Sequence, residues 1–126
     1  MPCDYVIDKE RRLVLSSAWD VFTAAEAMDH QNRLRSDVNF DPGYAQLLDG
    51  TRVTKVEATP SDVQRLADRT IFSPSSRRAF VTSRTAVFGV LRMFQVYREL
   101  AGAAEQIKVF HDMPSALEWL NEVKIR

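Results

Sequence analysis

The sequence contains a single cysteine, Cys3, among its 126 residues. One cysteine excludes a disulfide within the chain, which fits a reducing compartment. No repeated cysteine or paired histidine spacing indicates a metal site. The N-terminus also lacks the basic and apolar regions of a signal peptide, so we expect a cytoplasmic protein.

An excess of either charge is also missing. Lysine plus arginine number 17, and aspartate plus glutamate also number 17. Dedicated nucleic-acid binders usually carry a basic excess, so this balance argues against nucleic acid as a partner. The recurring arginines are interpreted as a solvated surface with ordinary ion pairs. No apolar run approaches the roughly 20 residues that a transmembrane helix needs, so we expect no membrane span.

What the sequence does contain is typical of one globular domain. Hydrophobic residues make up 45% and charged residues 27% of the chain. A chain of this length should bury roughly two thirds of the surface that its unfolded form exposes. No linker, repeat or low-complexity tract divides it, so residues 1–126 are interpreted as a single domain. We find no motif for catalysis or for binding a cofactor.

Short β-prone runs predict the strands. The first two flank a charged, turn-like segment and are interpreted as a hairpin. Residues 50–55 are interpreted as a connection, with a short extended piece through Val56. The expected strands are residues 5–7, 13–19, 44–49, 78–82 and 107–110.

Capping residues and apolar spacing predict four helices. Thr23 and Glu26 match a capping box, in which each side chain bonds the other's backbone amide. Pro60 fits the first position of the second helix, where a missing N–H costs nothing. Ser83 or Thr85 can cap the third. The expected helices are residues 24–35, a short one from 59–62 onward, 86–101, and a closing one capped by Asp112.

The resulting order is ββαβαβαβα. Alternating strands and helices imply a largely parallel sheet with helices packed on it. The opening hairpin adds an antiparallel strand, which makes the sheet mixed. The sequence therefore predicts an α/β fold with about four helices.

Several stretches, in this order along the chain, carry a resemblance to a known family. They are Tyr5–Asp8 with Arg12–Leu15, Leu47–Asp49, Arg78–Val81, and Val109–Asp112 leading into Ala116–Leu120. The chain resembles the STAS and SpoIIAA-like domains of the STAS/SEC14 type, and more closely a bacterial group of small uncharacterised proteins with that fold. The resemblance implies a mixed sheet of four or five strands in a domain that self-associates or binds a protein partner.

The family's regulatory serine has no counterpart here. STAS proteins that antagonise anti-sigma factors carry a phosphorylatable serine in an Asp-Ser pair before the helix that follows the central strand. In this sequence Glu57 stands at the aspartate position and Ala58 at the serine position. Alanine has no hydroxyl, so the usual phosphoswitch cannot operate there. Thr59 and Ser61 could substitute for it, although helix capping explains both.

Other candidate binding residues lie where strands lead into helices, because free amides at helix N-termini attract anions. Ser83 and Arg84 form the best of these positions, since they add a hydroxyl and a guanidinium. Gly89 interrupts a helical pattern. It allows either close approach by a ligand or partner or close packing against the sheet, and we favour packing. Arg92 lies three residues along and shares its face.

Three functions compete. The first, which we favour, is a non-catalytic regulatory or protein-interaction module, most simply a homodimer, with an exposed apolar patch and no deep pocket. The second is a protein that binds a small apolar or anionic ligand in a cavity lined by Phe88, Leu91, Phe94 or Tyr97. The third is an enzyme whose site assembles only in space, which would need a cleft with strongly shifted pKa values.

Overall fold

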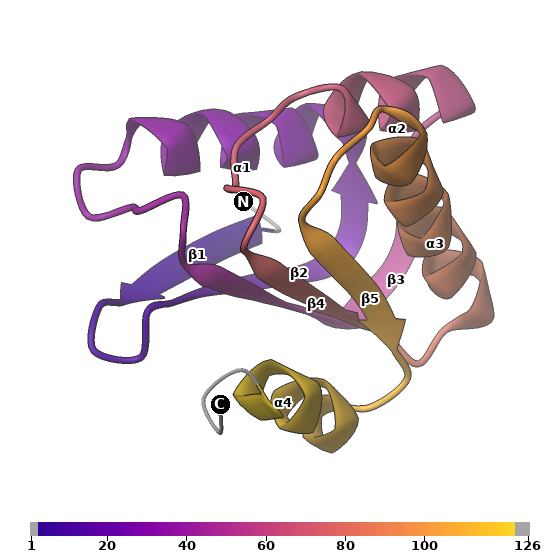
Figure 1. The fold of residues 1–126 in the computed structure, drawn as a ribbon. Helices are drawn as coiled ribbons and strands as arrows, with labels where there is room; N and C mark the ends of the chain where they lie inside the picture. Colours follow the sequence, from indigo (N-terminus) through magenta and orange to yellow (C-terminus); the bar gives the residue numbers. More distant parts are fainter. Residues whose placement is uncertain (1–2, 123–126) are drawn as a thin grey trace.

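The computed structural model describes residues 3–122 and contains one five-stranded sheet and four helices (Figure 1). The strands lie in the order β1-β2-β3-β4-β5, with β1 antiparallel to β2 and the other neighbours parallel. The predicted mixed α/β fold and its element order are confirmed. The elements are β1 Cys3–Asp8, β2 Leu13–Thr23, α1 Ala24–Ser36, β3 Ala45–Glu57, α2 Pro60–Ala67, β4 Arg77–Val81, α3 Thr85–Leu100, β5 Gln106–Phe110 and α4 Met113–Asn121.

The helices form two layers around the sheet. Each parallel strand is the neighbour of the next, and crossovers between parallel strands are almost always right-handed. Connections of one hand, advancing in one direction, place α1, α2 and α3 on the same face (Figure 1). The last helix, α4, covers the opposite face. Within residues 3–122, no helix has both the length and the apolar character needed to cross a membrane.

Capping fixes the starts of three helices, as the sequence predicts for each of them. Thr23 and Glu26 bond each other's backbone amides at α1, and Thr59 does the same with Asp62 at α2. The third helix differs, because α3 has Arg84 at its N-cap position and no capping side chain. The predicted cap at Ser83 or Thr85 is therefore wrong, since the cap position falls between these two residues. Asp112 caps α4, as predicted.

The third strand is much longer than predicted. Residues 50–55 were expected to form a connection, but they continue β3 to Glu57, and this prediction is wrong. The cause lies in β2, which extends to Thr23 and pairs with β3 along this whole stretch. Pairing with β4 ends at Asp49, so the second half of β3 exposes mostly polar side chains and has a loop-like composition. Val53 is buried and packs the second half of β3 into the core.

The two faces of the sheet have different cores. Under α4 the core is purely apolar, and we call this cluster the α4-side core. Its buried residues are Leu13, Leu47, Ala79, Val81, Ala116 and Leu120. Under α1, α2 and α3, apolar residues such as Val14, Phe72 and Phe80 share the interior with buried polar and charged side chains. The buried polar and charged side chains therefore lie on the face that α1, α2 and α3 cover.

Candidate functional site

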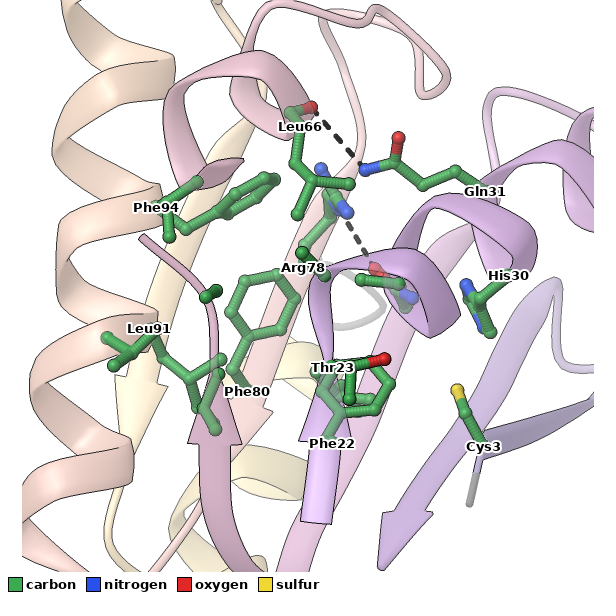
Figure 2. Close-up of a pocket in the computed structure, with 18 residues that line it drawn as sticks. Cys3, Phe22, Thr23, His30, Gln31, Leu66, Arg78, Phe80, Leu91 and Phe94 are labelled. Atoms are coloured by element: carbon green, nitrogen blue, oxygen red, sulfur yellow. Dashed lines mark hydrogen bonds between the residues drawn. The ribbon is translucent and has the colours of Figure 1, made fainter. Parts of the chain in front are cut away.

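A cavity of about 110 Å³ lies between the sheet and helices α1, α2 and α3 (Figure 2). Its walls are mostly apolar, and the side chains that dominate them are Phe22, Leu48, Leu66, Phe80, Leu91 and Phe94. A few polar side chains also reach it, namely Thr23, His30, Gln31, Gln46 and Arg78, together with the thiol of Cys3. Concave, mainly apolar sites with a few convergent polar groups are typical of small-molecule binding.

Regular secondary structure places these walls. Alternate residues of a strand face the same side of a sheet, so Gln46 and Leu48 of β3 share the helix-covered face. Arg78 and Phe80 of β4 lie on that face for the same reason. The helix α3 contributes Leu91 and other residues from the side that faces the sheet. The cavity is therefore a product of the fold rather than of a flexible loop.

A buried chain of hydrogen bonds runs along the cavity. Arg78 Nε donates to Gln46 Oε1 over 2.9 Å, and Gln46 Nε2 donates to Ser16 Oγ over 3.1 Å. Ser16 Oγ lies 3.0 Å from Nε2 of His30. Because Ser16 accepts from Gln46, its own proton is available for His30 Nε2. This pattern assigns the remaining imidazole proton to Nδ1.

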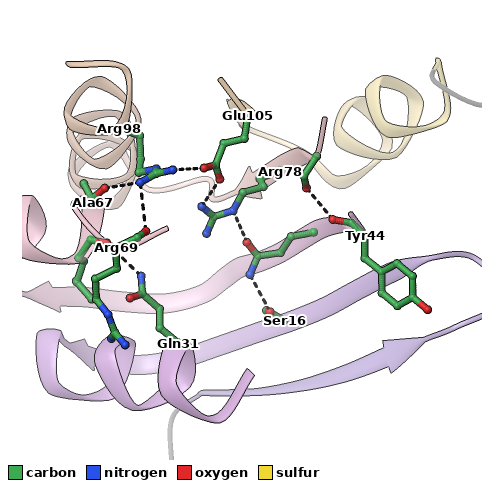
Figure 3. A network of polar contacts seen from close by, with 11 residues as sticks. Ser16, Gln31, Tyr44, Ala67, Arg69, Arg78, Arg98 and Glu105 are labelled. Atoms are coloured by element: carbon green, nitrogen blue, oxygen red, sulfur yellow. Dashed lines mark hydrogen bonds and ion pairs between the residues drawn. The ribbon is translucent and has the colours of Figure 1, made fainter. Parts of the chain in front are cut away.

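The same chain continues into a cluster of buried charges (Figure 3). Arg78 Nη1 donates to one oxygen of Glu105 over 2.8 Å, and Arg98 Nη2 pairs with the other oxygen. Arg98 Nη1 also donates to the carbonyls of Ala67, at 2.7 Å, and Arg69, at 3.2 Å. Arg78, Arg98 and Glu105 are each less than 9% exposed. The interpretation of the arginines as a solvated surface is therefore wrong for Arg78 and Arg98.

Aromatic rings and charges surround the Arg78 guanidinium. Its Cζ lies 4.5 Å from the ring centre of Phe72, 5.4 Å from that of Phe80 and 5.5 Å from that of Phe94. Burial lowers the pKa of Arg78, the adjacent Glu105 raises it, and the charge of Arg98 lowers it. An arginine remains protonated in proteins, so this group carries its positive charge into the core.

Two other titratable residues that line the cavity, His30 and Cys3, are neutral at pH 7. Burial lowers the pKa of His30 to about 4, with help from the charges of Arg33 and Arg78. Burial also raises the pKa of the Cys3 thiol to about 11, which keeps it from acting as a thiolate. Ser16 and His30 make the contact of a nucleophile and its base, but Ser16 does not line the cavity and is 2% exposed. The geometry therefore offers hydrogen-bond donors to a ligand more readily than a nucleophile.

The residues predicted as binding sites lie elsewhere. All seven are exposed, and none lines the cavity: Glu57, Thr59, Ser61, Ser83, Arg84, Gly89 and Arg92. Thr59 caps α2, as the capping interpretation requires. A role for these residues in binding a partner or ligand stays a prediction. Of the expected cavity residues, Leu91 and Phe94 line it, whereas Phe88 and Tyr97 do not.

Gly89 does not pack closely against the sheet. A methyl group built on its Cα would meet no atom within 4 Å, so the side of α3 that it occupies is open. The expectation that a small residue is needed here for packing is wrong. The helix α3 instead contacts the sheet through side chains such as Val87, Leu91 and Phe94.

Sequence reasoning missed the polar residues Ser16, Gln46 and Arg78, although one signal was present. Consecutive residues of a strand point to opposite faces, so Arg77 and Arg78 cannot both face solvent in a sheet that helices cover on both sides. In the structure Arg77 donates to the carbonyl of Trp119 on the α4 side, and Arg78 enters the other face. Gln46 stands directly opposite Arg78 in the parallel register.

Comparison with known proteins identifies the fold. The sequence matches no protein-family model, and no curated protein matches it. A crystal structure of an uncharacterised protein of the DUF3478 family from Shewanella loihica PV-4, described as having a SpoIIAA-like fold, superposes with a TM-score of 0.61. The alignment covers 94% of this chain and 93% of that chain at 18% sequence identity.

This chain has a SpoIIAA-like fold. The fold that the sequence resemblance implied is thereby confirmed. At 18% identity the likeness shows the fold alone, so any function of the SpoIIAA-like domain must be argued from its own residues.

Proposed function

We propose that this SpoIIAA-like domain binds a small, largely apolar molecule in the cavity beneath α1, α2 and α3. The observation that carries the proposal is the cavity itself, with apolar walls and a few polar groups that converge on it. Of the competing functions, the interaction module predicted no deep pocket. Ligand binding predicted an apolar cavity lined by Phe88, Leu91, Phe94 or Tyr97, and two of these four, Leu91 and Phe94, line the cavity found. The cavity therefore supports ligand binding over the interaction module that the sequence favoured.

The volume limits the ligand. An engineered apolar cavity of roughly 150 Å³ binds benzene, so a cavity of similar scale suits a molecule with about as many atoms. The cavity here measures about 110 Å³. A ligand that fits inside is therefore a small metabolite-sized molecule and much smaller than a membrane lipid.

Filling the cavity tests the proposal. Ala27 of α1 lines the cavity, whereas Ala25 of the same helix is exposed and does not. Benzyl alcohol, used as a probe, should shift the NMR resonances of cavity residues in the native protein. Ala27→Leu should abolish these shifts, and the matched control Ala25→Leu should retain them.

Two results would contradict or relocate the proposed binding. If benzyl alcohol perturbs no cavity resonance at millimolar concentration, and native mass spectrometry of the purified protein finds no bound small molecule, the domain does not bind ligands in this way. If Ala27→Leu and Ala25→Leu retain the probe's shifts equally, the probe binds outside the cavity.

A regulatory or protein-interaction module, most simply a homodimer, is the second candidate function. Its support is an apolar strip on the outer side of α3, where Val96 is 42% and Leu100 is 77% exposed. These residues are four apart and share one helix face. Alanine at position 58 would leave such a module without the usual regulatory serine. Light scattering at high concentration should then give a dimer mass that Leu100→Glu reduces to a monomer; a monomeric wild-type protein would exclude the homodimer.

A further inference from the structure

We infer that the ligand of this cavity is a small carboxylate with an apolar body, whose negative charge pairs with Arg78. This inference rests on the proposed ligand-binding function and specifies the chemical class of the ligand. It starts from the residues that line the cavity, of which only Arg78 carries a charge at pH 7. No aspartate or glutamate is among them.

The buried charges beside the cavity do not balance. Arg78 and Arg98 share the single carboxylate of Glu105, so the cluster carries one uncompensated positive charge. Arg69, whose carbonyl contacts Arg98, has no carboxylate within 4.0 Å among residues 3–122. A buried charge without a counter-charge is costly, which favours the binding of an anion nearby.

The geometry directs that positive charge to the cavity. The side chain of Arg78 is 9% exposed, and its Nε and Nη1 atoms are engaged by Gln46 and Glu105. Its Nη2 atom has no hydrogen-bond partner in the described part of the chain and remains as a donor. Figure 2 shows the guanidinium extending from β4 toward Leu66 of α2, and both residues line the cavity.

The charge and the walls together favour a carboxylate over a phosphate. One uncompensated positive charge calls for one negative charge, whereas a phosphate near neutral pH brings up to two and needs several donors. The remaining walls, among them Phe80, Leu91 and Phe94, suit an aromatic or short aliphatic body. Benzoate combines these features at the scale of the cavity.

Titration calorimetry with three probes at pH 7.5 tests the inference on the full chain. Benzoate should bind at least about tenfold more tightly than benzamide, its neutral counterpart of the same shape. The reason is that a hydrogen bond between Arg78 and a charged carboxylate is stronger than one between Arg78 and a neutral amide. Inorganic phosphate alone should not compete with benzoate. Arg78→Gln should remove the preference for benzoate and keep benzamide binding. Arg35→Gln, which changes an exposed arginine of α1 that does not line the cavity, should leave both unchanged.

The possible failures are distinguishable. Equal affinities for benzoate and benzamide in the wild-type protein would overturn the inference and leave the proposed function intact. Competition by phosphate at similar concentration would overturn the carboxylate assignment. Binding of neither organic probe would contradict both. Because the benzoate-to-benzamide ratio is measured on the wild-type protein, the test holds even if Arg78→Gln fails to fold.

Discussion

The two faces of the sheet differ in what they bury, although the same strands supply both. The α4-side core is apolar throughout, with fully buried residues such as Ala79, Val81 and Ala116. The opposite face buries a continuous polar chain from His30 to Arg98. A buried ion pair is often no more stabilising than apolar residues of similar volume. On the α4 side, Arg77 is only partly buried and no charged side chain of the described residues is fully buried, so the fold can close a face without burying a charge. The polar chain therefore points to a role beyond packing.

The largest expected effect comes from removing the shared counter-charge. Glu105→Gln keeps the shape of the side chain but leaves Arg78 and Arg98 without a carboxylate. Breaking a buried ion pair costs about 3–5 kcal/mol, so urea unfolding should show a loss of that size. The control Glu122→Gln removes an exposed partner of Arg77 and should cost less than about 1 kcal/mol. Equal small losses for both variants would show that the polar chain contributes no more than a surface pair.

A cavity in the α4-side core should weaken the protein without affecting the other face. Leu120 is 8% exposed, and Leu120→Ala should cost about 2–5 kcal/mol in urea unfolding. Benzoate binding measured on the folded variant should stay at the wild-type value. The control Leu100→Ala changes an exposed leucine and should cost less than about 0.5 kcal/mol. Altered benzoate affinity in Leu120→Ala would show that the two faces are coupled.

Acid should weaken the polar face through His30. Its folded pKa of about 4 lies below the ordinary value of 6.5, so protonation favours the unfolded chain. The stability that neutral His30 contributes is complete above pH 6.5. It decreases as the pH falls, and the loss amounts to roughly 3 kcal/mol at pH 4. Urea unfolding between pH 7 and pH 4 should show this slope, and His30→Gln should flatten it.

This pH window separates His30 from the carboxylates. Hydrogen bonds from backbone amides lower the pKa values of Asp37, Asp62 and Asp112 below 3.8, so their contributions are lost at lower pH. A slope that survives in His30→Gln would assign the acid sensitivity to other groups.

The smallest expected effect lies outside both cores. Gly89 is an exposed position inside α3 with open space around it. Gly89→Ala should raise the free energy of unfolding by about 1 kcal/mol, because alanine favours the helix. Its benzoate binding should be unchanged. Loss of binding to a ligand or partner would restore the interpretation that Gly89 allows a close approach.

Local patterns were sufficient to predict most of the fold. The capping residues Thr23 and Thr59 act on amides three residues away, so the sequence shows their role directly. The second half of β3 depends instead on the length of β2, which lies far away in the sequence. The burial of Arg78 depends on Glu105, which is 27 residues away. Arginine is usually exposed, and only the assembled sheet and helices show which arginine has a buried partner.

The long third strand has a consequence for solubility. Beyond Asp49, β3 pairs with β2 alone among the described strands, so its other edge has backbone groups free of a neighbouring strand. Such an edge is a template on which another chain can add a strand and start aggregation. This stretch carries three exposed charged residues, Arg52, Lys55 and Glu57. An incoming strand would have to desolvate their charges. The polar residues that made the second half of β3 look like a loop in the sequence therefore also oppose the addition of another strand at this edge.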